Sequence, residues 1–278
     1  MDAFKDRVAV ITGGAGGIGL TMARAFAARG AKLVLADLDE AALQRATTEL
    51  TTAGAAVLGV RTDVTKLASV QALAEATTQR FGAVHIVCNN AGVATFGEIC
   101  ESTHQDWEFT MNVNFWGVVH GVETFVPRLI AQGTGGHIVN TASMAGLVGM
   151  QWLGIYCASK FAVVGLTEAL QRELKPRGIG VSVLCPMIVA TNINQNSVRM
   201  RPTELRNPGE QPLLENGAPV DVPDGAMKGG TIAPEEVARR VVRAIERKDL
   251  YILTHPEQRE FLRRRAKRLD AMFEEGTW

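Results

Sequence analysis

The chain has 278 residues, with 29 Lys and Arg against 29 Asp and Glu, and its formal net charge is therefore +0. Without an excess of positive charge it lacks the electrostatic footprint of a nucleic-acid-binding protein. No stretch reaches the uninterrupted run of about 18 apolar residues that a membrane-spanning helix needs, and the charged segment from Met1 to Arg7 is unlike a signal peptide. We therefore expect a cytoplasmic protein with neither membrane nor nucleic-acid partners.

The cysteines do not form a pattern that would bind a metal. There is no Cys-x-x-Cys pair and no cluster with histidine among Cys88, Cys100, Cys157 and Cys185. A single α/β domain of this length buries enough surface to be stable without a metal or a disulfide. We therefore expect reduced, structural thiols and no metal site.

Short β-branched runs alternate with longer helical stretches along the chain. The predicted strands are 8–12, 32–36, 56–61, 84–88, 137–140, 180–185 and 250–253, and the helices after the first three extend to about 29, 53 and 81. Near-continuous apolar strands separated by helices are typical of a parallel sheet that is covered on both faces. The sequence therefore predicts an α/β fold, a single Rossmann-like domain over 1–278 with a doubly wound sheet of about seven strands and a ligand crevice at their carboxyl ends.

The alternation breaks between Thr191 and Gly230, where prolines and glycines are interleaved. A loop of this length inside a compact domain usually covers or binds a ligand, so residues 191–230 are predicted to be a substrate-binding loop or lid. The alternative is a surface insertion with no role.

A glycine-rich turn follows the first predicted strand and reads Thr12-Gly13-Gly14-Ala15-Gly16-Gly17-Ile18-Gly19. Gly14, Gly16 and Gly19 satisfy the Gly-x-Gly-x-x-Gly pattern, in which the missing side chains let backbone N–H groups approach a pyrophosphate at the positive end of a helix. A strand before the turn and a helix after it favour this interpretation over a plain glycine turn.

Asp37 ends the second predicted strand, where a carboxylate can accept hydrogen bonds from an adenosine ribose. A 2′-phosphate there would meet a like charge, and Leu38 follows with no Arg or Lys beside it. The sequence therefore favours NAD over NADP as the cofactor. The alternative is that Asp37 only caps the following turn.

Of the two tyrosines, one lies in Tyr156-Cys-Ala-Ser-Lys160 at the start of a predicted helix. Four-residue spacing places the phenol and the ammonium on one helix face, and Ser143 follows the fifth strand at the predicted crevice. A cation near the phenol favours phenolate, which can take an alcohol proton as hydride leaves carbon, while Ser143 holds the substrate oxygen. This pattern predicts an alcohol dehydrogenase or ketone reductase, and a structural Tyr with a surface Lys is the alternative.

Together these motifs resemble the short-chain dehydrogenase/reductase family, in its NAD-dependent branch. The resemblance covers about residues 8–191 and rests on Thr12-Gly-x-x-x-Gly17-x-Gly19, Asn89-Asn90-Ala91-Gly92, Asn114, Ser143 and Tyr156-x-x-x-Lys160. It implies a catalytic tetrad, in which Asn114 holds a water of the proton relay, Ser143 positions the carbonyl, Tyr156 is the acid and base, and Lys160 binds the nicotinamide ribose and tunes Tyr156.

The motifs and the resemblance also imply a set of cofactor contacts. Asp63 and Val64 are expected at the adenine, Asn90 and Gly92 along the crevice, and Val189 and Thr191 at the carboxamide. The full set is Gly13, Gly17, Ile18, Gly19, Asp37, Leu38, Asp63, Val64, Asn90, Gly92, Tyr156, Lys160, Val189 and Thr191. The chain departs from the family after the sixth strand, where relatives carry Pro-Gly and this sequence has Pro186-Met187, so we expect Met187 to alter the turn or the pocket floor.

The residues predicted to line the substrate pocket are mostly apolar and include no Arg or Lys. They are Val93, Phe96, Met144, Met150, Trp152, Leu153, Met187 and Ile193. A carboxylate or phosphate would need a cationic clamp, so we expect the small-molecule substrate to be a bulky, neutral secondary alcohol or its ketone, aryl or polycyclic. Core packing is the alternative for each of these residues. The segment 250–257 and the Arg-rich stretch after it add a weaker similarity to bacterial aryl-carbinol dehydrogenases.

Small residues interrupt the large apolar ones on the predicted helices 113–130 and 158–174, among them Gly117, Gly121, Ala162, Gly165 and Ala169. This apolar surface predicts a homodimer or homotetramer. Alternative functions are an NAD(H)-binding regulator without turnover, or an enoyl reductase or epimerase on the same fold. A regulator does not need Ser143, Tyr156 and Lys160 together, and enoyl reductases space Tyr and Lys more widely.

Overall fold

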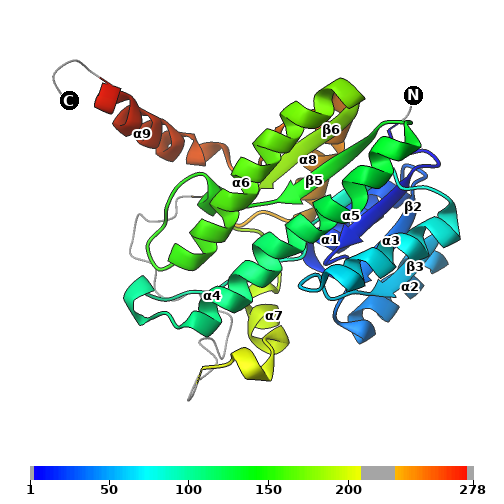
Figure 1. Ribbon diagram of the computed structural model, residues 1–278, viewed down its shortest axis with the longest axis horizontal. Helices are drawn as coiled ribbons and strands as arrows, with labels where there is room; N and C mark the ends of the chain where they lie inside the picture. The colour runs from blue at the N-terminus through cyan, green and yellow to red at the C-terminus, as the bar shows by residue number, and fades with distance from the viewer. Residues whose placement is uncertain (1–2, 208–228, 274–278) are drawn as a thin grey trace.

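A computed structural model describes residues 3–207 and 229–273 of the chain. In these residues, parallel strands form one sheet of seven in the order β3-β2-β1-β4-β5-β6-β7 (Figure 1). The strands are β1 (Val8–Thr12), β2 (Lys32–Asp37), β3 (Val57–Arg61), β4 (Ile86–Asn89), β5 (Gly136–Thr141), β6 (Ile179–Cys185) and β7 (Tyr251–Leu253). The order reverses between β1 and β4, which places a crevice at their carboxyl ends. The predicted Rossmann-like, doubly wound sheet is confirmed.

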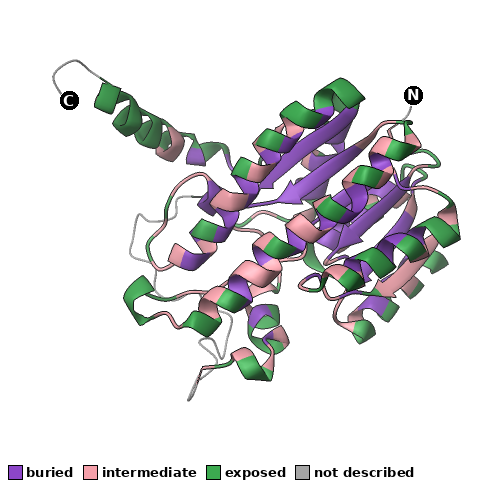
Figure 2. Ribbon diagram, in the orientation of Figure 1, coloured by how far each residue is buried: buried purple, intermediate pink, exposed green. Residues whose placement is uncertain are grey.

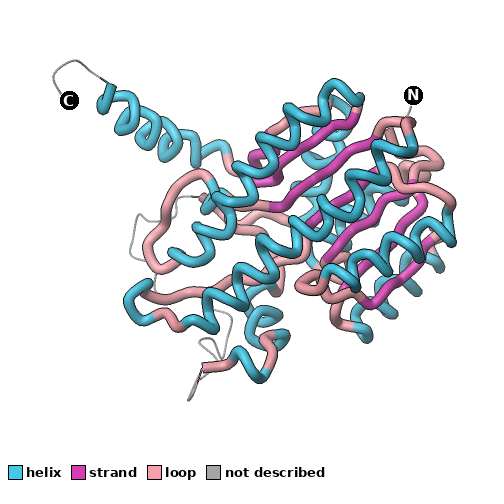
Figure 3. Tube along the Cα trace, in the orientation of Figure 1, coloured by secondary structure: helices cyan, strands magenta, loops and turns pink. Residues whose placement is uncertain are grey.

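Helices cover both faces of this sheet (Figure 3). One face packs against α1 (Gly17–Ala27), α2 (Glu40–Thr52) and α8 (Pro234–Arg247), and the other against α3 (Leu67–Phe81), α5 (Gly117–Gln132) and α6 (Gly154–Leu174). The central strands are buried along their whole length between the two layers (Figure 2). Their near-continuous apolar sequence follows from this position, because both sides of each strand face a core.

A π-helical turn over Asn112–Trp116 joins α4 (His104–Met111) to α5. The sequence pattern predicted one regular helix from 113 to 130. A π turn fits an extra residue into the helix, and such turns occur frequently at functional sites. Here the turn carries Asn114, which is completely buried.

Two small residues of α5 face the body of the protein rather than a partner subunit. A Cβ on Gly117 would lie 2.9 Å from Cγ2 of Val64, and one on Gly121 would overlap the side chain of Asn89. These glycines are therefore required by internal packing, contrary to their interpretation as part of a subunit face. Gly165 of α6 has open space in front of it, and an oligomer remains a prediction.

The first part of the predicted 191–230 loop is helical. Residues 193–200 form α7 (Ile193–Met200), and a 3₁₀ turn follows at Thr203–Leu205. The stretch 193–200 contains no proline, and Pro202 is the second residue after it, where it cannot continue a helix. Residues 208–228 of the predicted loop lie outside the described residues. In the described residues after this gap, the N–H of Ile232 donates to the carbonyl of Ile188 at 3.1 Å.

The C-terminal helix α9 (Arg259–Asp270) projects away from the sheet and is mostly exposed (Figures 1 and 2). Among residues 3–207 and 229–273, no helix is both long and apolar enough to cross a membrane. The four cysteines are free, and three of them, Cys88, Cys157 and Cys185, are buried.

A buried histidine connects the strands β5 and β6. The Ser182 hydroxyl donates to the carbonyl of Asp249 at 2.6 Å, so it accepts a hydrogen bond from Nε2 of His137 at 2.8 Å. Burial lowers the pKa of His137 from its ordinary 6.5 to about 3. The imidazole is therefore neutral in the folded protein at any pH above that value.

We expect this histidine to make folding sensitive to acid. Between pH 6.5 and about 3 the unfolded chain binds a proton at His137 that the folded protein does not bind, so the free energy of unfolding falls as the pH falls, by up to about 4 kcal/mol. Denaturant unfolding of wild type and His137→Gln across this range should show a shallower pH dependence in the variant. His104→Gln, at an exposed position, is the control. Equal slopes in wild type and His137→Gln would contradict the assignment.

Candidate active site

Three glycines shape the turn between β1 and α1. Gly13 and Gly17 have φ values of 62° and 50°, a region that favours glycine. A Cβ on Gly19 would lie 2.0 Å from the carbonyl oxygen of Gly13, whereas one on Gly16 would meet no protein atom within 4 Å. Within the Gly14, Gly16 and Gly19 pattern, protein packing requires Gly14 and Gly19, because a Cβ on Gly14 would lie 2.8 Å from the Ile11 carbonyl oxygen, and it leaves the space beside Gly16 open. Gly13 and Gly17, with positive φ, are further positions where the turn favours glycine.

Asn90 holds this turn against the ends of neighbouring strands. Its amide Nδ2 donates to the carbonyl of Thr12 at 3.0 Å, and its Oδ1 accepts from the Thr141 hydroxyl at 3.3 Å. The Thr12 hydroxyl in turn accepts from the backbone N–H groups of Asn90 and Ala91. These bonds connect the carboxyl ends of β1, β4 and β5, and they keep backbone N–H groups of the glycine turn at the crevice.

The Asp37 carboxylate lies at the end of β2 beside the glycine turn. It accepts hydrogen bonds from the backbone N–H groups of Ala15 and Asp39, both at 3.1 Å. Burial raises the pKa of Asp37, and these two N–H groups partly offset that rise. The bond to Asp39 is the turn cap proposed as the alternative role. The bond to Ala15 adds a contact with the glycine turn that a cap alone does not require.

The remaining predicted cofactor contacts lie around the same crevice. The Asp63 carboxylate accepts from the backbone and hydroxyl of Thr65, and Val64 is buried against Gly117. Ile18 and Val189 pack, partly buried, against one core cluster. Further along the chain, Cγ2 of Thr191 lies 3.2 Å from where a Cβ on Gly17 would stand, while Leu38 is partly buried after Asp37.

Asn114 points from the π turn into the segment after β4. Its Oδ1 accepts from the N–H of Val93 at 2.8 Å, and its Nδ2 donates to the Val93 carbonyl at 2.9 Å and to the Ser159 hydroxyl at 3.2 Å. A Cβ on Gly92 would lie 3.3 Å from this Oδ1 and 3.5 Å from Nζ of Lys160, so a side chain at Gly92 would crowd both groups. Ser159 did not emerge from the sequence analysis, although it stands between Tyr156 and Lys160 in the motif.

Ser143, Tyr156 and Lys160 come together at the carboxyl end of β5. The ammonium of Lys160 is 3% exposed, donates to the carbonyl of Thr141 at 3.0 Å, and lies 5.5 Å from the centre of the Tyr156 ring. Burial lowers the pKa of Lys160 to about 8. Protein atoms around the phenol raise the pKa of Tyr156 to about 12, and a hydrogen bond with Ser143 acts in the opposite direction. Tyr156 itself keeps partial exposure, so it remains within reach of a ligand.

Comparisons with known proteins agree with this geometry. A family model described as short chain dehydrogenase matches residues 7–202. The chain belongs to the short-chain dehydrogenase/reductase family of oxidoreductases. A "CLA biosynthesis dehydrogenase/reductase" of Lactiplantibacillus plantarum is 36% identical over 286 residues, covering 97% of this chain and 95% of that protein. A "C alpha-dehydrogenase" of Sphingobium sp. is 37% identical, covering 94% and 85%.

A solved structure of the same family has a closely similar fold. It is a short-chain dehydrogenase/reductase from Burkholderia phymatum in complex with NAD, with a TM-score of 0.88 and 42% sequence identity. The match covers 99% of this chain and 98% of that one. The similarity therefore extends beyond the segment matched by the family model and includes the C-terminal part.

The predicted pocket residues of this dehydrogenase/reductase fall into two groups. Met144 and Val93 are 1% and 7% exposed, and Met144 packs in a core cluster. For Met144 the packing alternative holds, because a side chain enclosed by its own core cannot contact a substrate. Partial exposure is retained by the other predicted residues, Phe96, Met150, Trp152, Leu153, Met187 and Ile193.

Two loops form one wall beside this pocket. The N–H of Gly97 donates to the carbonyl of Trp152 at 2.9 Å, and Gly97 forms an isolated β-bridge with Leu153. The bond fixes the loop after Gly92 against the loop before Tyr156. Phe96 and Trp152 are therefore brought to the same side of the crevice, although they are far apart in the sequence.

Met187, where relatives carry glycine, lies in a turn that the C-terminal part of the chain supports. Its N–H donates to the Thr254 hydroxyl at 3.3 Å, and this hydroxyl lies 2.7 Å from Nδ1 of His255. Nε2 of His255 lies 3.0 Å from the carbonyl of Gly230. Since φ of Met187 is not in the left-handed region, the turn accommodates a side chain here.

Substitutions at two glycines test where packing within the turn excludes a side chain. Gly19→Ala is expected to lower the free energy of unfolding by about 2 kcal/mol or more, because the new Cβ overlaps the Gly13 carbonyl. Gly16→Ala is the matched control and should stay within about 1 kcal/mol of wild type, since its Cβ meets open space. Denaturant unfolding measures both. A larger loss in Gly16→Ala than in Gly19→Ala would contradict the close contact between Gly19 and the Gly13 carbonyl.

Proposed function

We propose that this protein is an NAD-dependent secondary alcohol dehydrogenase or ketone reductase with Tyr156 as acid and base. The observation that carries the proposal is the position of three groups. The buried ammonium of Lys160 lies 5.5 Å from the centre of the Tyr156 ring, and the Ser143 side chain forms a hydrogen bond with the Tyr156 phenol. A plain dinucleotide-binding protein has no need for these three groups at one point. Their position at the carboxyl end of β5 is where ligands bind in a doubly wound sheet.

The residues present fit NAD as the cofactor. The glycine turn presents backbone N–H groups at the start of α1, where a pyrophosphate is stabilised, and Gly19 allows the close approach of the two segments. The Asp37 carboxylate at the end of β2 would accept bonds from the ribose and repel a 2′-phosphate. The NAD complex of the Burkholderia phymatum relative supports the same assignment.

Tyr156 has to become a base for the alcohol to lose its proton. A shift of its pKa from about 12 to near 7 corresponds to about 7 kcal/mol of preferential stabilisation of phenolate. The hydrogen bond with Ser143 lowers the pKa of Tyr156. A cation such as the Lys160 ammonium, 5.5 Å from the ring centre, also favours phenolate. Bound NAD⁺ supplies the hydride acceptor and a further positive charge. Tyr156 then removes the hydroxyl proton while Ser143 holds the substrate oxygen, and in reduction Tyr156 returns the proton.

The substrate we propose is a bulky, neutral, aryl or polycyclic alcohol or its ketone. The partly exposed residues of the pocket are apolar, and no Arg or Lys stands among Phe96, Met150, Trp152, Leu153, Met187 and Ile193. A surface of this kind buries apolar substrate area and offers no partner to a carboxylate. The similarity to the C alpha-dehydrogenase of Sphingobium sp. supports a substrate of this class.

The Tyr156→Phe variant tests the acid and base. We expect it to lower kcat by at least about a thousandfold, because the proton acceptor is lost, while NADH affinity changes less than about threefold. The measurements are NADH formation with a panel of aryl and alicyclic alcohols, and NADH binding by fluorescence. Undiminished turnover in Tyr156→Phe would refute the mechanism. Wild-type protein that binds NADH and oxidises none of the alcohols would favour the regulator instead.

The Asp37→Ala variant tests the cofactor assignment separately. Removing the carboxylate is expected to lower the ratio of kcat/KM with NAD to kcat/KM with NADP by about tenfold or more, because both a ribose acceptor and a repulsive charge are lost. Asp39→Asn is the control. Its carboxylate accepts from the N–H of Ala42 and is two residues from Asp37, and the ratio should stay near that of wild type. A ratio unaltered in Asp37→Ala would show that the ribose assignment is wrong.

A further inference from the structure

Helix α7 crosses the crevice and is attached to both sides of it. At its start, Thr191 lies over the glycine turn. In its middle, the buried Ser197 hydroxyl accepts from the N–H of Ala94 at 2.8 Å. Near its end, Arg199 forms an ion pair of 2.7 Å with Asp39 after β2. The helix is therefore fixed to the glycine turn, to the segment after β4 and to the turn after β2, and Ile193 of the predicted substrate pocket stands at its start.

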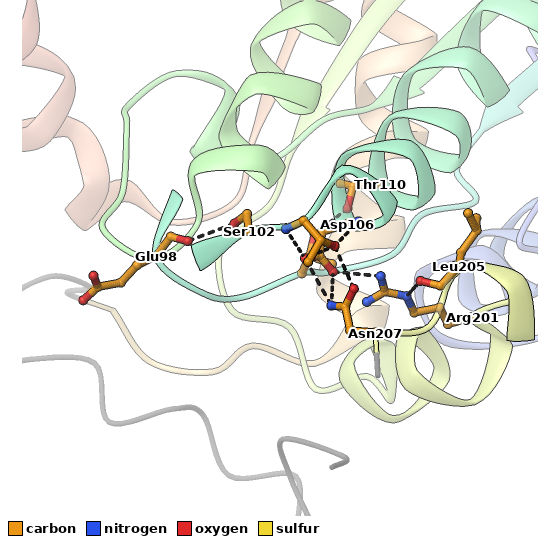
Figure 4. A network of polar contacts seen from close by, with 9 residues as sticks. Glu98, Ser102, Asp106, Thr110, Arg201, Leu205 and Asn207 are labelled. Carbon is orange, nitrogen blue, oxygen red and sulfur yellow. Dashed lines mark hydrogen bonds and ion pairs between the residues drawn. The ribbon is translucent and has the colours of Figure 1, made fainter. Parts of the chain in front are cut away.

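The residue after α7 is held by a buried polar network (Figure 4). Arg201 is 6% exposed, and its guanidinium lies 2.8 Å from Oδ1 of Asp106 on α4 and donates through Nε to the carbonyl of Leu205 at 2.7 Å. Asn207 adds a second connection, because its Nδ2 donates to the same carboxylate at 3.1 Å. The Thr103 hydroxyl lies 2.7 Å from Oδ1 of Asn207, where α4 begins.

The Asp106 carboxylate binds both the start of α4 and the chain that follows α7. It accepts from the N–H of Thr103 at 2.8 Å, which completes the capping box at the start of α4. Burial alone would raise its pKa, but the bonds from Thr103 and Arg201 lower it below the ordinary value, so the carboxylate is ionised at neutral pH. The same helix continues through the π turn to Asn114, and the network thus connects α7 to the element that carries a predicted catalytic residue.

A buried ion pair is an inefficient way to gain stability, because both charges lose their hydration. What such a pair provides is a fixed orientation of the groups that it joins. The planar guanidinium of Arg201 bonds to Asp106 on one side and to the Leu205 carbonyl on the other, so it fixes the orientation of the chain that leaves α7. An apolar contact of the same size would fix the direction of this segment less closely.

We propose that Arg201, with Asp106 and Asn207, is a positioning group that holds α7 across the crevice and so sets the binding of bulky alcohols. The class of substrate in this inference rests on the proposed function. The positioning of α7 rests on the contacts of Arg201, Asp106 and Asn207. Arg201 acts through α7 rather than on the reacting atoms. Its loss should loosen the pocket wall that α7 carries, while Tyr156, Ser143 and Lys160 remain in place.

The test variant is Arg201→Met, which keeps much of the apolar stem and removes the guanidinium. We expect faster hydrogen exchange at the amides of 193–205 in the protein without substrate, by at least about tenfold. We also expect KM for a bulky aryl alcohol such as 1-phenylethanol to rise at least about tenfold, with kcat within about threefold and KM for 2-propanol little changed. Exchange and KM both equal to wild type would overturn the proposal.

Arg199→Met on the same helix is the matched control. It removes the ion pair with Asp39, in which the Arg199 side chain is 58% exposed, and exposed pairs contribute little. Exchange and KM should therefore stay near wild type, and an effect as large as that of Arg201→Met would overturn the special role of the buried network. In an Asp106→Asn background, Arg201→Met should add less than about twofold to KM, and full additivity would also count against the proposal.

A variant that fails to fold and a failure of the proposed function lead to different results. Should Arg201→Met fail to fold, Asn207→Ala removes the second bond to Asp106 without stranding a buried charge, and the same direction of change in exchange and KM is expected. An unchanged Asn207→Ala would then overturn the inference. If wild type oxidises no alcohol, the proposed function fails, and hydrogen exchange alone still decides whether Arg201 positions α7.

Discussion

The buried ammonium of Lys160 is the charge on which the proposed chemistry of this site depends. The Lys160 side chain is 3% exposed, and its ammonium donates to the Thr141 carbonyl near Gly92 and lies 5.5 Å from the centre of the Tyr156 ring. Burial makes this charge costly, which is why the pKa of Lys160 falls to about 8. The same burial strengthens its effect on Tyr156, because little water screens the two groups from each other.

Much of the polar structure around the crevice serves to hold that charge in place. Asn90 connects the glycine turn to Thr141, whose carbonyl accepts from Lys160. Asn114 is fixed by both backbone groups of Val93, and its amide bonds to Ser159 in the same helical turn as Lys160. The glycine turn and the Tyr156 motif thus belong to one connected network, so the nucleotide side and the chemical side of the crevice are positioned together.

The substrate side is organised differently. Its wall consists of α7 and two loops that meet through single bonds, such as Gly97 to Trp152 and Ala94 to Ser197. These elements do not belong to the sheet, and a few polar contacts set their position. The turn at Met187 and the Arg201 network belong to these attached segments.

The sequence by itself determined the elements whose signals are local. Strand periodicity predicted the parallel sheet, and the four-residue spacing of Tyr156 and Lys160 placed both on one helix face. Tertiary structure decided what depends on residues that are distant in the chain. Gly19 is required because the Gly13 carbonyl approaches it, Met144 belongs to the core, and the π turn orients Asn114. Arg201 and Asp106 are 95 positions apart in the sequence and meet only once the chain after α7 lies against α4. Periodicity reports which face of an element is apolar, but it carries no information about which distant group that face will meet.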